Sequence, residues 1–202
     1  MKKVFITTTP LQGKDDLKKL EYVPQQFELA QGNRNTAFPI IPIIAEHLKD
    51  MGETEIIVIR MENSDTSKNY QRFVQEVEEL GLDKSCIKTI SFPETQNSKT
   101  HVEVMLQLIE MIPNHSVVRA CVTFGTKPIA IIVSYALQCI KKALFDVEVR
   151  GIYYGELQRT DGEAQKANLC DITMLLQVGE IIEDLKSLGI DDIKSGLKSL
   201  LG

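Results

Sequence analysis

The sequence predicts a doubly wound α/β domain built on a mainly parallel sheet. Short runs rich in β-branched residues alternate with longer runs of helical periodicity, a pattern typical of β-α-β units. Residues 55–60 are almost continuously apolar, as expected of a strand that helices cover on both faces. The helix expected over residues 127–143 is apolar nearly all round, which predicts that it is covered on more than one side.

Five strands, separated mostly by helices, are expected in the parallel part. The strands are predicted over residues 3–8, 55–60, 86–92, 117–124 and 147–154, and the helices over residues 36–50, 67–80, 97–112 and 127–143. The third strand is short and polar, which predicts a place near the edge of the sheet. In the third helix, the side chains expected to face inward are Val102, Met105, Leu106 and Ile109. Residues 9–35 are expected to form a long polar loop.

After residue 154 the pattern changes. Asp161-Gly162 is a hairpin-type turn signal, and residues 169–173 are expected to return as a strand. Apolar periodicity then predicts helices over residues 174–188 and 190–201. The expected architecture is therefore a Rossmann-like domain over residues 1–188 with a C-terminal hairpin and helices. Residues 189–202 are expected to be a short amphipathic helix or a linker to an effector domain.

The composition of the chain excludes several classes of function. Of the 202 residues, 43% are hydrophobic and 25% charged, which is typical of a globular domain, and the net charge of −5 argues against direct capture of long nucleic acids. No run approaches the roughly 20 apolar residues that cross a bilayer, and no signal-peptide core is present, so a cytoplasmic protein that does not bind membranes is expected. The four cysteines and the acidic residues show no metal-ligand spacing, so no metal site is expected. The candidate segments contain neither a P-loop nor a GxGxxG fingerprint, and no cofactor is expected. The histidines suit no catalytic triad.

The junction over residues 122–128 is the strongest candidate for a binding site, because ligands of open parallel sheets bind at the carboxyl ends of the strands. Gly125 permits a positive φ angle, Thr126 is a natural N-cap, and Pro128 marks the start of a helix. The first amides of that helix, with Lys127 beside them, can bind an anion. The alternative is a capped helix with a solvated lysine and no ligand.

Other candidates follow the remaining strands. The hydroxyls of Thr8 and Thr9 can bind phosphate or ribose, or simply end a strand with β-favouring residues. Arg34, in the long loop, is expected either to pair with phosphate or to be exposed to solvent. The remaining candidate ligand-binding residues, each close to a strand end, are Pro10, Leu11, Gln12, Arg60 and Tyr154.

Three segments, in this order, give the chain a family resemblance. Thr7-Thr8-Thr9-Pro10, the junction over residues 122–128, and Gly151-Ile152-Tyr153-Tyr154-Gly155, followed by Asp171-Ile172-Thr173, resemble CARF domains, the CRISPR-associated Rossmann-fold sensors of type III systems. The resemblance covers about residues 1–188. It implies a two-fold homodimer that holds a cyclic oligoadenylate in a pocket made by both subunits. By position, the resemblance implies that the ligand contacts come from Thr8, Thr9, Pro10, Leu11, Gln12, Gly125, Thr126 and Lys127.

The function expected from the resemblance is a cyclic oligoadenylate sensor of antiviral defence that regulates an attached or separate effector. The first alternative is a metal-independent ring nuclease, in which a ribose 2′-hydroxyl attacks the adjacent phosphate. Lys127 would then stabilise the developing charge, and Thr8 or Thr9 would orient the attack. The second alternative is a Rossmann-like nucleotide-binding protein of unrelated purpose.

Overall fold

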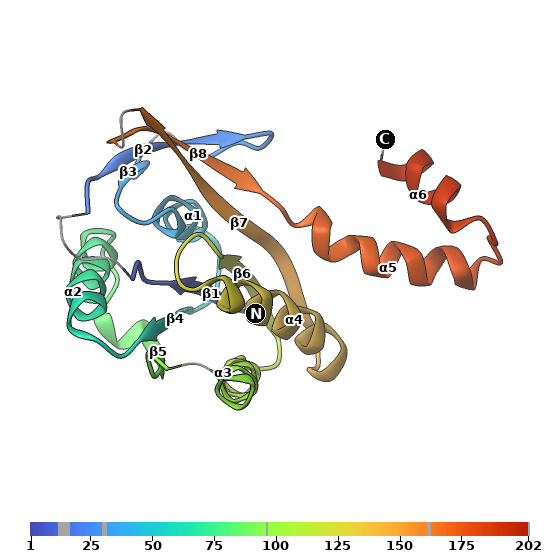
Figure 1. The fold of residues 1–202 in the computed structure, drawn as a ribbon, viewed down its shortest axis with the longest axis horizontal. Helices are drawn as coiled ribbons and strands as arrows, with labels where there is room; N and C mark the ends of the chain where they lie inside the picture. The colour runs from blue at the N-terminus through green and yellow to red at the C-terminus, as the bar shows by residue number, and fades with distance from the viewer. Residues whose placement is uncertain (12–16, 30–31, 96, 161–162, 202) are drawn as a thin grey trace.

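The computed structural model describes residues 1–11, 17–29, 32–95, 97–160 and 163–201 and has a doubly wound α/β architecture (Figure 1). Over these residues one sheet has the strand order β3-β2-β8-β7-β6-β1-β4-β5. The strands are β1 (Lys2–Thr8), β2 (Leu20–Gln25), β3 (Asn35–Thr36), β4 (Thr54–Met61), β5 (Ile87–Phe92), β6 (Ser116–Cys121), β7 (Val147–Thr160) and β8 (Glu163–Asp171).

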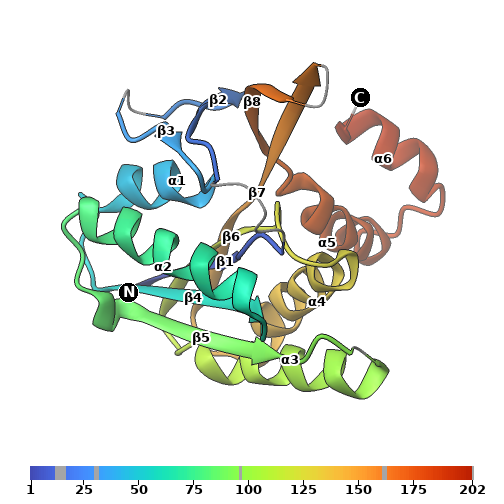
Figure 2. The same ribbon diagram turned by 60° about the vertical axis from the view of Figure 1, so that its left-hand side comes forward.

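Helices cover both faces of the sheet (Figure 2). α1 and α2 pack on one face around Phe38 and Phe73, whose rings meet edge to face at 5.2 Å. α3 and α4 pack on the other face, where Leu108 and Val133 belong to a second apolar core. The helices are α1 (Ile40–His47), α2 (Ser64–Glu79), α3 (Ser98–Met111), α4 (Lys127–Ala143), α5 (Met174–Ser187) and α6 (Ile193–Leu201), with a 3₁₀ turn at η1 (Lys84–Cys86).

The parallel part of the sheet reverses its winding at β1. This strand pairs in parallel with β4 on one side and with β6 on the other. From β1 the chain winds outward through β4 to β5 and then returns to wind through β6 to β7. The carboxyl ends of β1 and β6 therefore lie side by side at a topological switch point, where open α/β sheets place their ligands. The expected edge position of β5 is confirmed.

The expected loop over residues 9–35 is wrong in part, because this segment contains β2. β2 pairs in parallel with β8 and extends the sheet beyond the hairpin formed by β7 and β8. Tyr22 is its anchor, at 2% exposure. Pro24 argues against a strand in the sequence, because proline has no amide hydrogen to donate. The strand tolerates it because β3 pairs with Leu20 and Glu21, so the outer edge of β2 is open at Pro24. The expected hairpin turn at Asp161-Gly162 lies outside the described residues.

The inward face expected for the third helix is also wrong in part. Val104 and Leu108 are the buried residues of α3, whereas Val102 and Leu106 are about half exposed, at 51% and 49%. Apolar residues occur around most of this helix, so its periodicity in the sequence does not single out one face. The contacts with β5 and α4 decide the orientation instead.

The first helix begins later than expected because a buried carboxylate holds Thr36 and Ala37 outside it. Glu76 of α2 is 2% exposed and accepts hydrogen bonds from the Thr36 hydroxyl and, at 3.3 Å, from the Ala37 amide. Arg72 Nε donates to the same carboxylate at 3.2 Å. These donors compensate for the cost of burying the charge, and the helix begins only at Ile40.

No helix in the described part of the chain has the length and apolar character needed to cross a membrane.

Gly155 of β7 fits closely between Pro39, which precedes α1, and Tyr22 of β2, and replacing it tests that packing. A Cβ at this position would lie 2.9 Å from atoms of Pro39 and Tyr22. Gly155→Ala should therefore lower the free energy of unfolding by about 1–3 kcal/mol through overpacking, measured by urea denaturation. Gly179→Ala is the matched control, because a Cβ there meets nothing within 4 Å. Equal stabilities for the two variants would contradict the close fit.

Candidate functional site

A cavity of about 430 Å³ lies at the switch point, beside the carboxyl ends of β1 and β6 and against β7. Segments far apart in the chain form it: the end of β1, the junction between β6 and α4, and the middle of β7. The described residues that line it are Pro10, Leu11, Leu17, Thr123, Phe124, Gly125, Tyr154, Gly155 and Leu157. Its volume falls within the roughly 300–1,000 Å³ typical of small-molecule sites.

Thr8 fastens the end of β1 to the junction. Its hydroxyl donates a hydrogen bond of 2.7 Å to the carbonyl oxygen of Phe124. Gly125 follows with a φ angle of +89°, a conformation that L side chains rarely adopt, and a Cβ there would lie 3.4 Å from Thr8 Cβ. The chain therefore turns sharply against Thr8 before α4 begins. The Thr8 hydroxyl, predicted to contact a ligand, holds the wall of the cavity in place.

Thr123 connects the same junction to β7. Its Oγ1 accepts a 2.7 Å hydrogen bond from the Gly155 amide and lies 3.1 Å from Cys121 Sγ. Sequence reasoning did not choose Thr123 as a site residue, although a hydroxyl directly after a buried strand was an available signal. Burial raises the pKa of Cys121 to about 11, so the thiol is protonated at neutral pH and is no nucleophile.

The walls of the cavity are mainly apolar. Leu11, Leu17 and Leu157 contribute aliphatic surface, and Phe124 contributes an aromatic ring that meets Phe38 edge to face at 6.3 Å. Tyr154 lines the cavity and is 43% exposed. Such a combination of flat aromatic and aliphatic surface suits the face of a planar ring system. None of the described residues that line the cavity is acidic.

A helix N-terminus and a lysine side chain lie next to Gly125, where α4 starts. Lys127 is the first residue of α4 and its side chain is exposed. Thr126 occupies the N-cap position with an extended backbone, but its side chain makes no capping hydrogen bond, which differs from the expected cap. Pro128 is in the first turn, as predicted. The helix dipole and Lys127 both favour an anion at this end of α4, even though the protein is acidic overall.

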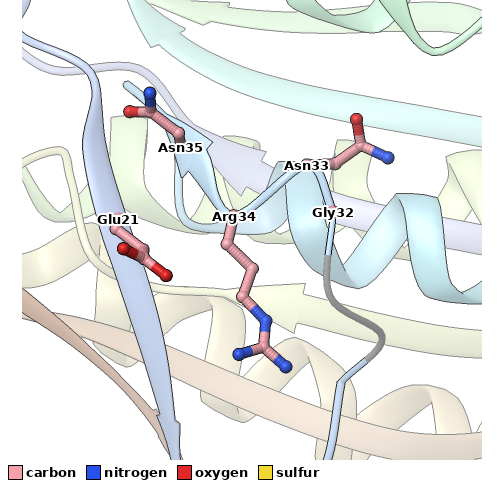
Figure 3. Close-up of a pocket in the computed structure, with 5 residues that line it drawn as sticks. All are labelled: Glu21, Gly32, Asn33, Arg34 and Asn35. Carbon is pink, nitrogen blue, oxygen red and sulfur yellow. The ribbon is translucent and has the colours of Figure 1, made fainter.

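Arg34 and Arg60, two of the predicted ligand-binding residues, do not line this cavity. Arg34 lines a separate hollow of about 320 Å³ near β2 and β3, together with Glu21, Gly32, Asn33 and Asn35 (Figure 3). Its guanidinium donates a hydrogen bond to the carbonyl oxygen of Leu29, so it braces its own loop. Arg60 stacks over Tyr70 of α2. Gln12 lies outside the described residues.

Comparison of the chain with protein-family models and with curated proteins gives no match. Within the described residues, no group of three or more histidine, cysteine, aspartate or glutamate side chains is placed to hold a metal ion. Among the described residues, the site offers hydroxyl groups, apolar walls and the start of α4.

The Thr8 hydrogen bond gives a testable prediction about the site's architecture. Thr8→Val keeps the shape of the side chain but leaves the carbonyl of Phe124 without its donor. It should lower the free energy of unfolding by about 1–3 kcal/mol, measured by chemical denaturation. Thr8→Ser keeps the hydroxyl and should lose less. If the Thr8→Val variant and the wild-type protein have the same free energy of unfolding, the Thr8 hydrogen bond does not stabilise the junction.

Proposed function

We propose that this chain is a sensor domain that binds a cyclic oligoadenylate, as in the CARF domains of type III CRISPR defence. One observation carries the proposal: the three segments that give the chain its resemblance to that family contribute residues to a single cavity. Pro10 comes from the first segment, Thr123 and Gly125 from the second, and Tyr154 and Gly155 from the third. Pro10 is more than a hundred positions from the other two segments in the sequence, and these residues line one cavity at the switch point.

The chemistry of the cavity supports a nucleotide-derived ligand. The apolar walls suit an adenine ring, and the start of α4 with Lys127 suits a phosphate. A ring of several nucleotides exceeds the volume of this one cavity. The proposal therefore includes a homodimer in which two such cavities share one ring and pass the signal to a fused or separate effector.

The positions of the three predicted catalytic residues favour binding over cleavage. The Thr8 proton is engaged with the Phe124 carbonyl, and Thr9, one residue further on, has the opposite orientation in the alternation of β1. Lys127, which was predicted to stabilise the developing charge, is exposed beside the junction. A ring nuclease also needs a group that positions the ribose hydroxyl for in-line attack. Cleavage of the oligoadenylate ring is therefore the alternative outcome, which chromatography of the ligand detects.

Isothermal titration calorimetry with cyclic tri-, tetra- and hexa-adenylate tests the proposal. Binding of one ring per two chains, with the ring recovered intact by chromatography, is the expected result. Recovery of a linear product with a 2′,3′-cyclic phosphate would support the ring nuclease instead. Absence of binding to all three rings would overturn the oligoadenylate proposal and leave an α/β domain that binds another ligand.

Lys127→Ala tests the role assigned to the start of α4. Loss of one or two charge-assisted contacts should weaken oligoadenylate binding by about 1.5–3 kcal/mol, or roughly 10- to 150-fold in Kd. Lys99→Ala is the control, because Lys99 is 86% exposed and lies on α3. Calorimetry on both variants gives the comparison. Equal affinity for the Lys127 variant and the wild-type protein would show that the phosphate lies elsewhere.

A further inference from the structure

Two buried polar atoms at the end of β1 and β4 lack a hydrogen-bond partner among the described residues. They are the hydroxyl oxygen of Thr9 and the Nε atom of Arg60, and Thr9 is only 1% exposed. A buried polar group without a partner costs about 1–3 kcal/mol, and native structures retain few of them. Because the two unpartnered atoms belong to neighbouring strands, one ligand could satisfy both of them.

The register of the sheet places these two residues next to each other. β1 pairs with β4 so that Thr8 lies opposite Ile59, and the Thr9 amide continues the ladder with a 3.4 Å hydrogen bond to the Ile59 carbonyl. The next pair in this register is Thr9 and Arg60. Side chains of paired residues in parallel strands point to the same face. Phe5 and Val58, of the same parity, pack in the core that includes α2, so Thr9 and Arg60 face α2.

Arg60 lies over an aromatic ring and has no charge partner among the described residues. Its guanidinium carbon lies 4.7 Å from the centre of the Tyr70 ring, which is within the range of a cation–π contact. No ion pair joins Arg60 to an aspartate or glutamate of the described residues, whereas Arg72 and Arg150 each pair with a glutamate. Arg60 as a whole is only partly buried, so part of its side chain reaches solvent, whereas its Nε atom lies beneath the surface.

The chain beyond Thr9 is also fixed on this side. Asn69 of α2, itself buried, donates a 2.7 Å hydrogen bond to the carbonyl oxygen of Pro10. This bond holds the segment after β1 against the helix that carries Tyr70. Thr9 and Arg60 therefore belong to a preorganised group supported by β1, β4 and α2, rather than to a loose surface.

We propose that Thr9 and Arg60 form an anion subsite on the α2 side of β1, in which the guanidinium and the hydroxyl donate to one phosphate group. An arginine that lies against an aromatic ring, with its Nε unpartnered among the described residues, is suited to recognising phosphate oxygens. The choice of phosphate as the natural occupant rests on the proposed function, whereas the two unpartnered atoms do not. Since Thr8 faces the Gly125 junction and Thr9 faces Arg60, a ligand with more than one phosphate can straddle the end of β1.

Nuclear magnetic resonance of the full chain with inorganic phosphate tests this subsite without any nucleotide. The signal of the Arg60 Nε–Hε group is assigned by its disappearance in Arg60→Lys. Phosphate should shift this signal saturably at constant ionic strength, and Thr9→Val should weaken the phosphate affinity by roughly 3- to 10-fold, the effect of one lost hydrogen bond. Amide spectra establish that both variants are folded. Arg150, exposed and paired with Glu148, supplies the control signal.

Each other outcome overturns part of the proposal. A phosphate shift that does not saturate, or that equals the shift of the Arg150 signal, would overturn the subsite. An affinity unchanged in Thr9→Val would remove Thr9 from it. A saturable shift of equal size with acetate would overturn the choice of phosphate over carboxylate. Failure of oligoadenylate to bind in calorimetry, with phosphate still shifting Arg60, would overturn the proposed function and leave the subsite standing.

Discussion

The pairing of β1 with both β4 and β6 is the constraint on which the rest of the structure depends. Because the chain winds outward from β1 in both directions, the helices after β1 and β4 cover one face, and those after β5 and β6 cover the other. The connections consequently diverge at the carboxyl ends of β1 and β6, which opens the space that the cavity fills. The Thr8 hydrogen bond to Phe124 then sets how closely the two ends approach.

The hairpin formed by β7 and β8 supplies the remaining wall. β7 continues well beyond the end of β6, so Tyr154, Gly155 and Leu157 stand above the switch point. The Gly155 amide is tied to Thr123, and β2 adds to the far edge of β8. The site is thus enclosed by an antiparallel addition to a parallel sheet, and its shape depends on both parts.

Charge is distributed unevenly over the site. The protein is acidic, with a net charge of −5, yet the described lining of the cavity contains no carboxylate, and Lys127 lies at the start of α4. On the opposite side of β1, Arg60 also lacks a carboxylate partner among the described residues. A local excess of donors on an acidic surface favours a small anion over a long polyanion, because net charge governs approach of large nucleic acids and local geometry governs binding.

The sequence by itself determined the parallel core and the Gly125 junction, because apolar runs, helical periodicity and a glycine next to a helix start are local signals. Only the tertiary structure decided that Thr8 and Thr9 have different surroundings, that Arg34 and Arg60 lie outside the cavity, and that β2 joins the sheet. These outcomes follow from register and from strand pairing across long separations. The local sequence of a strand does not specify which distant strand it pairs with, so these pairings are seen only in the tertiary structure.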